Sequence, residues 1–190
     1  RGQWAVVLRG GYDVATATGL GVGVYYAPWE RVQIGAELST YFAGGAVGLA
    51  TKANLFRSTD DSLLISAEAG VRAFGFLTAQ GSGFTDSDVN SESSIVVEPR
   101  FAIEWRPDAR HDWGLYAELG TQHHYGDYDP NAFLNGQRIS GNQWRHAIRA
   151  AAGVNRRISD SWAVSLKGGV LGGNGTPIPV ALVGFTKVFD

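Results

Sequence analysis

The sequence contains no cysteine and no methionine, not even at position 1, in 190 residues. Without cysteine the chain needs no disulfide bond, and cysteine usage does not indicate a cellular compartment. Because the chain does not begin with methionine, we expect it to be a processed or trimmed form whose targeting segment has been removed.

Long apolar runs and a strong net charge are also missing. No stretch of 18 consecutive apolar residues occurs, which excludes a conventional transmembrane helix. The formal net charge is −2, which excludes the basic footprint of a nucleic-acid-binding protein. No linker or change of composition divides the chain, so residues 1–190 are predicted to form a single domain.

What the sequence does contain favours an all-β protein. It has 26 glycines and 12% aromatic residues, a composition typical of many strands joined by tight turns. Apolar and polar residues alternate with period two along most of the chain, which predicts strands. The predicted strands cover residues 3–13, 19–29, 31–42, 46–56, 62–76, 94–105, 113–124, 143–155, 161–171 and 178–189.

The segment "LLISAEAGVRAFGF" (63–76) shows the alternation most clearly. One face carries Leu63, Ile65 and Val71, and the other carries Glu68 and Arg72 among small residues. A soluble barrel alternates too, with its bulky apolar side inward. The alternation by itself therefore does not decide which solvent surrounds the barrel.

Tryptophan placement is the first feature that favours a membrane. In a chain that crosses ten times, five tryptophans fall at one end of the barrel, and Trp144 falls at the other. Aromatic rings collected at two levels are typical of the two interfaces of a bilayer. The predicted interface residues are Trp4, Trp29, Trp105, Trp113, Trp144 and Trp162.

Loop length is the second feature. With both termini at one end, the turns at that end are short and polar, as in "APWER" (27–31). Both long connections, 77–93 and 125–142, fall at the opposite end. Short periplasmic turns and long external loops are the pattern of outer-membrane barrels.

The position of charged residues is the third feature. The apolar faces carry almost no charge along their central stretch, and in water they would form a continuous exposed apolar band. The opposite faces would line a lumen. The predicted lumen-lining charges are Arg9, Glu37, Lys52, Glu68, Arg72, Glu98, Arg100, Glu104, Glu118, Arg145, Arg149 and Lys167.

Together these features predict a closed antiparallel up-and-down transmembrane β-barrel, because lipid cannot satisfy a free sheet edge. We expect ten strands, with eight as the alternative count. A soluble ligand-binding barrel is the competing interpretation.

This pattern resembles the small bacterial outer-membrane β-barrels of the OmpA-like, OmpX-like and opacity-protein type. The resemblance rests on the architecture and on the ending "VALVGFTKVFD". Such families usually end in an aromatic residue that the barrel-assembly machinery recognises, whereas here Asp190 follows Phe189. Val180 and Leu182 share one face of the last strand while Phe185 and Phe189 share the other, and we expect a β-bulge to reconcile them.

The resemblance implies an integral protein of the bacterial outer membrane. Its expected role is structural or surface-binding, with 77–93 and 125–142 as external loops. Its expected partners are the lipid bilayer and lipopolysaccharide, the barrel-assembly machinery and a protein at the external loops, but no nucleic acid. A narrow channel for ions or small solutes is the alternative, since ten strands lie close to the filled end of the barrel range.

Catalysis at the outer rim is the third hypothesis. The segment "QHHYGDYDPN" (122–131) offers four residues that could bind a ligand, or serve as a base and its orienting acid. No partner motif on another strand accompanies them, so we expect neither an enzyme, nor a metal site, nor a cofactor. The candidate loop-binding residues are His123, His124, Asp127 and Asp129.

Overall fold

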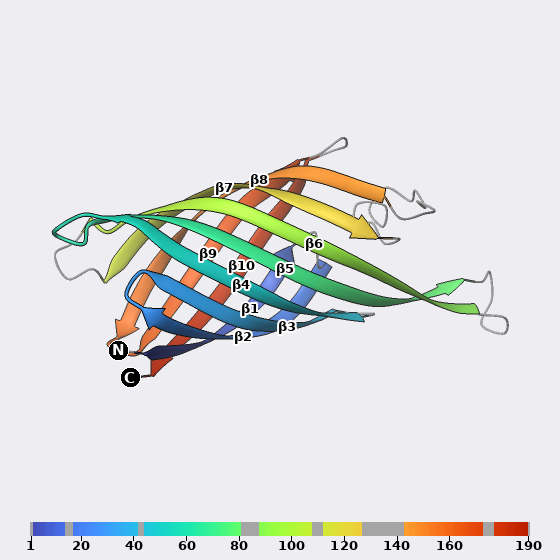
Figure 1. Cartoon of the computed structure of the whole chain (residues 1–190), viewed down its shortest axis with the longest axis horizontal. Helices are drawn as coiled ribbons and strands as arrows, with labels where there is room; N and C mark the ends of the chain where they lie inside the picture. Colours follow the sequence, from blue (N-terminus) through green and yellow to red (C-terminus); the bar gives the residue numbers. More distant parts are fainter. Residues whose placement is uncertain are drawn as a thin grey trace.

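The computed structural model describes residues 2–13, 17–41, 44–80, 88–107, 112–126, 143–172 and 177–189. They form ten strands and no helix (Figure 1). The strands are β1 (Gln3–Asp13), β2 (Ala17–Trp29), β3 (Val32–Tyr41), β4 (Gly44–Arg57), β5 (Leu63–Gln80), β6 (Asp88–Trp105), β7 (Trp113–Gly126), β8 (Gln143–Ser159), β9 (Trp162–Gly172) and β10 (Ile178–Phe189).

Each strand pairs with its neighbours in the sequence, and β1 pairs with β10 to close the barrel. All ten pairings are antiparallel. The predicted up-and-down barrel is therefore confirmed, with ten strands and not eight. Both chain ends lie at the same end of the barrel (Figure 1).

The last strand differs from the prediction. Its pairing with β1 runs without a register shift from Tyr12–Ala181 to Trp4–Phe189, so the expected β-bulge is absent. Val180 is buried and Leu182 half-buried, whereas Phe185 and Phe189 are exposed. The apolar residues simply divide between the two faces, because the barrel interior also accommodates apolar side chains at this position.

The prediction of a long loop at 77–93 is wrong in its extent. Strand β5 continues to Gln80 and β6 begins at Asp88, and the two pair over this whole extension. Glycine, serine and aspartate in this segment favour a loop, but cross-strand backbone hydrogen bonding overrides such weak propensities. In the second predicted loop, 125–142, Tyr125 and Gly126 belong to β7, and the remainder lies outside the described residues.

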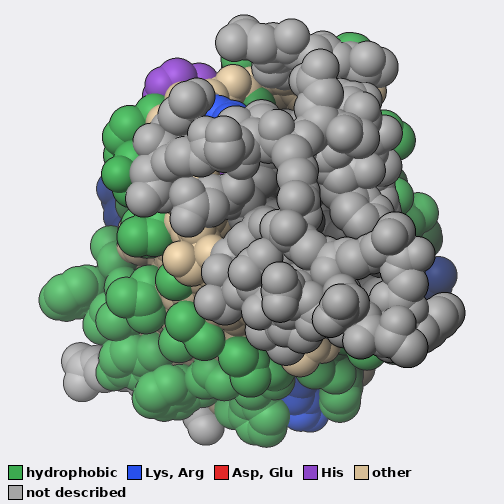
Figure 2. All heavy atoms as spheres, turned by 90° about the vertical axis from the view of Figure 1, so that its right-hand side faces the viewer, with side chains coloured by type: hydrophobic (Ala, Val, Ile, Leu, Met, Phe, Trp, Pro, Cys, Tyr) green, Lys and Arg blue, Asp and Glu red, His purple; other side chains and the backbone are tan. Residues whose placement is uncertain are grey.

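The outside of the barrel is apolar along its flank. Large hydrophobic side chains are exposed on every strand, among them Leu20, Leu49, Phe101, Leu119 and Ile148 at 60–71% of their full accessibility. Figure 2, which looks onto the end opposite the termini, shows hydrophobic side chains around this flank. In the described part of the chain, no helix has the length and hydropathy needed to cross a membrane.

Aromatic residues mark both edges of the apolar flank. At the end that carries the termini, Arg156 lies over the Trp113 ring at 4.7 Å and Lys187 over the Trp162 ring at 4.9 Å. At the other end the rings of Tyr125 and Trp144 lie 5.1 Å apart. Such amphipathic pairs suit a boundary between an apolar and an aqueous phase.

Glycines make room for a large side chain inside the barrel. Tyr25 of β2 is buried, and its ring lies over Gly23 of its own strand and Gly35 of β3. A Cβ atom at Gly35 would lie only 2.2 Å from Cδ1 of that ring. The absence of a side chain at position 35 therefore fixes where Tyr25 can lie.

We predict that Gly35→Ala destabilises the barrel by about 1–3 kcal/mol, because the added methyl group displaces the Tyr25 ring. Urea unfolding of the protein refolded in detergent micelles measures the change. Gly168→Ala is the matched control, since no heavy atom lies within 4 Å of a Cβ built at Gly168. Equal stability of the two variants would contradict the packing role assigned to Gly35.

Candidate functional site

Glu118 of β7 lies at the centre of a first group of ion pairs inside the barrel. Its side chain is 0% exposed. It accepts hydrogen bonds from Nε of Arg149 at 3.0 Å, from Nζ of Lys167 at 2.9 Å and from the hydroxyl of Tyr116. A carboxylate so fully removed from water is stable only because cations and hydrogen-bond donors surround it.

Glu68 of β5 joins this group through a shared arginine. Nε of Arg100 donates to Glu68 at 2.7 Å and lies 3.9 Å from Glu118. Lys52 of β4 lies 3.2 Å from the other oxygen of Glu68. The first group therefore links β4, β5, β6, β7, β8 and β9.

A second group crosses the other side of the lumen. Arg72 lies 2.8 Å from Glu98 and 3.5 Å from Glu37. Arg9 donates to Glu37 at 2.9 Å and to the Tyr25 hydroxyl at 2.6 Å, and that hydroxyl in turn donates to Glu37. Gln122 donates to Glu98 at 2.7 Å.

We call the charged members of the two groups the lumen network. It comprises ten of the twelve charges that the sequence assigned to the lumen. The other two are Glu104, which pairs with Arg106 at 3.1 Å, and Arg145, which lies half-buried on β8. The members of the lumen network are Arg9, Glu37, Lys52, Glu68, Arg72, Glu98, Arg100, Glu118, Arg149 and Lys167.

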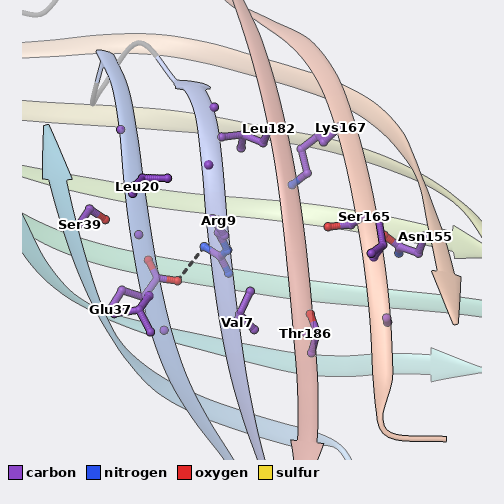
Figure 3. A pocket seen from close by; sticks show the side chains of 18 of the residues that line it. Val7, Arg9, Leu20, Glu37, Ser39, Asn155, Ser165, Lys167, Leu182 and Thr186 are labelled. Atoms are coloured by element: carbon purple, nitrogen blue, oxygen red, sulfur yellow. Dashed lines mark hydrogen bonds and ion pairs between the residues drawn. The ribbon is translucent and has the colours of Figure 1, made fainter. Parts of the chain in front are cut away.

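A cavity of about 470 Å³ lies beside the lumen network, against the wall formed by β1, β2, β9 and β10 (Figure 3). On this wall Gly19 and Gly21 occupy successive inward positions of β2 and leave the space empty, while the Tyr25 ring covers Gly23. The sequence prediction assigned only charged residues to the lumen, so it missed this cavity and the bonds of Tyr25 and Tyr116 to the network. The segment "GLGVGVYY" (19–26) could have indicated the cavity and Tyr25, because glycine occupies each polar-face position ahead of that tyrosine.

The candidate rim residues do not form one site. Strand alternation sends His124 inward, where it is buried, and leaves His123 half-buried on the outer face. His123 instead meets His146 of β8, with their Nδ1 atoms 2.7 Å apart. The two predicted histidines, His123 and His124, belong to strand β7 and not to a loop. Asp127 and Asp129 lie outside the described residues.

Within the described ranges, no group of three or more His, Asp or Glu side chains is placed to hold a metal ion. The charges of the lumen are instead engaged with one another. The interior thus offers a set of fixed cations and hydroxyl groups around a cavity with a mixed polar and apolar lining.

No protein-family model matches this chain, and no curated protein matches it. Several solved structures do. They include the N-terminal β-barrel domain of Pseudomonas aeruginosa OprF, with 11% identity, a TM-score of 0.48 and full coverage of both chains.

The outer membrane protease OmpT from Escherichia coli matches with 11% identity and a TM-score of 0.47, covering 98% of this chain and 94% of its own. The Acinetobacter baumannii outer membrane protein Omp33 matches with 10% identity and a TM-score of 0.38, covering 98% and 97%. None of these structures is similar enough to carry an inference about activity.

We predict that Glu118→Gln destabilises the barrel by about 3–5 kcal/mol, because it leaves buried cations without their shared carboxylate. Chemical unfolding in micelles measures the loss. Arg57→Gln is the control, since it breaks the exposed pair with Asp61, whose contribution is about 0–1 kcal/mol. If both variants lost the same small amount, the network would contribute no more than a surface ion pair.

Proposed function

We propose that this protein is an integral barrel of the bacterial outer membrane, with a structural or surface-binding role. The observation that carries the proposal is the continuous band of exposed hydrophobic side chains around the barrel. A soluble monomer rarely exposes an apolar surface of this extent. The same surface is the stable arrangement when hydrocarbon surrounds it.

The height of the band fits a bilayer. On β7 the outward-facing rings of Trp113 and Tyr125 mark the two levels, with apolar Leu115, Ala117 and Leu119 between them and Thr121 and the paired His123 next to Tyr125. At ~3.4 Å per residue and a strand tilt of ~40°, twelve residue steps span roughly 30 Å. This length matches the hydrocarbon core of a membrane, which is about 30 Å thick.

The lumen network supports an anchoring role. Its ion pairs cross the barrel interior and connect eight of the ten strands, with Tyr25 adding β2. A barrel cross-braced in this way presents its external segments on a rigid base. We propose lipopolysaccharide as the lipid partner at the outer surface, the barrel-assembly machinery as the partner for insertion, and a protein partner at the external segments.

A narrow path for ions or small solutes is the second candidate, and the cavity beside the network favours it. A rim hydrolase has less support, because His123 and His124 point to opposite sides of the barrel wall. Planar-bilayer recordings separate the first two roles. Folded, inserted protein without conductance steps supports the anchor, and reproducible steps support the path.

We predict that Leu119→Arg lowers the stability of the protein in lipid bilayers by about 2–4 kcal/mol, because position 119 lies midway between the two aromatic levels. Ile158→Arg is the matched control. Ile158 is 65% exposed but lies beyond the Trp113–Arg156 level, next to the register shift of β8. Its substitution is expected to cost about 0–1 kcal/mol.

Reversible unfolding of each variant from phospholipid vesicles measures its change in the free energy of unfolding. Equal effects of the two arginines would argue against burial of this face in hydrocarbon. A folded, monodisperse protein in water without detergent would overturn the membrane assignment and favour a soluble barrel.

A further inference from the structure

The cavity in the lumen has an uneven charge distribution. Six cations of the lumen network line it, against two acids, Glu37 of the network and Glu104, which pairs with Arg106. Glu68, Glu98 and Glu118 do not line the cavity, although each holds one or more of these cations in place. The lining cations are Arg9, Lys52, Arg72, Arg100, Arg149 and Lys167.

The charge of the network is itself unbalanced. Among the described residues, it joins six cations to four carboxylates. Glu37, Glu68 and Glu118 each serve more than one cation. A positive excess in a partly desolvated space attracts an anion strongly, because water screens it poorly there.

The remaining lining adds hydrogen-bond donors and shape. Ser39, Asn155, Ser165 and Thr186 contribute hydroxyl and amide groups, and Figure 3 shows Ser39 on one side of Arg9 and the other three on its other side. Guanidinium groups match the geometry of carboxylates and phosphates. A volume of about 470 Å³ lies within the range of ~300–1,000 Å³ that is usual for sites of small organic ligands.

We propose that this cavity is a binding site for a small oxyanion, a carboxylate or phosphate compound, held among the lining cations. The anion completes the charge of the lumen network and occupies the space that the β2 glycines leave open. This site goes beyond the membrane role and does not depend on it, because the site belongs to the folded barrel in any environment.

The test uses the full chain refolded in zwitterionic micelles, titrated with sodium phosphate and with sodium succinate in a calorimeter. Sodium chloride at equal ionic strength is the reference. We expect saturable binding of at least one oxyanion and a higher thermal unfolding midpoint in that salt than in chloride. Absence of both effects in protein with native circular dichroism would overturn the proposal.

The double variant R9Q/K167Q locates the site. It makes the network neutral, and both affected acids keep a cation, since Arg72 remains near Glu37 and Arg149 remains bonded to Glu118. We expect at least a tenfold loss of affinity, and an intermediate loss for each single variant. Native affinity in these variants would place the anion elsewhere and overturn the proposal.

Lys187→Gln is the matched control. Lys187 donates to Ser161 at 2.9 Å and lies over the Trp162 ring at the end that carries the termini, apart from the cavity. The Lys187→Gln variant removes one positive charge, as each single variant does. Because this charge lies away from the cavity, we expect unchanged affinity for the oxyanion. A comparable loss with Lys187→Gln would show a general charge effect and overturn the assignment to the cavity.

Discussion

The pairing of β1 with β10 is the constraint on which the rest of this structure depends. It converts an open ten-stranded sheet into one without edges. Every strand then satisfies its backbone groups through its two neighbours, which is the condition for a sheet in contact with hydrocarbon. Closure also creates two separate environments, an outer flank and an enclosed lumen, and strand alternation distributes the side chains between them.

The polarity of the two environments is the reverse of that in a soluble barrel. Residues such as Leu119 and Phe101 are exposed outside, while Glu118 of the same wall has no exposed side-chain surface. Burying so many charges is unfavourable unless each finds a partner. The lumen network provides those partners, and its links between distant strands add rigidity that backbone pairing alone does not supply.

Glycine gives the lumen its shape. Gly35 makes room for Tyr25, which holds Arg9 and Glu37 together, and the inward glycines of β2 leave one wall hollow. The cavity therefore lies beside the network, and six cations of the network line it. This arrangement connects the structural role of the ion pairs with the proposed oxyanion site, because the same cations take part in both.

The sequence by itself determined the alternation, the ten strands and the division of residues between two faces, since a period of two needs no knowledge of distant partners. It did not determine the strand ends at Gln80 and Asp88, the unbroken register of β10, or the meeting of His123 with His146. The pairing of each strand with its neighbours decided these. Whether Glu118 meets Arg149 and Lys167, and where a cavity remains, depends on how side chains from many strands share one enclosed space, and only the tertiary structure decides that.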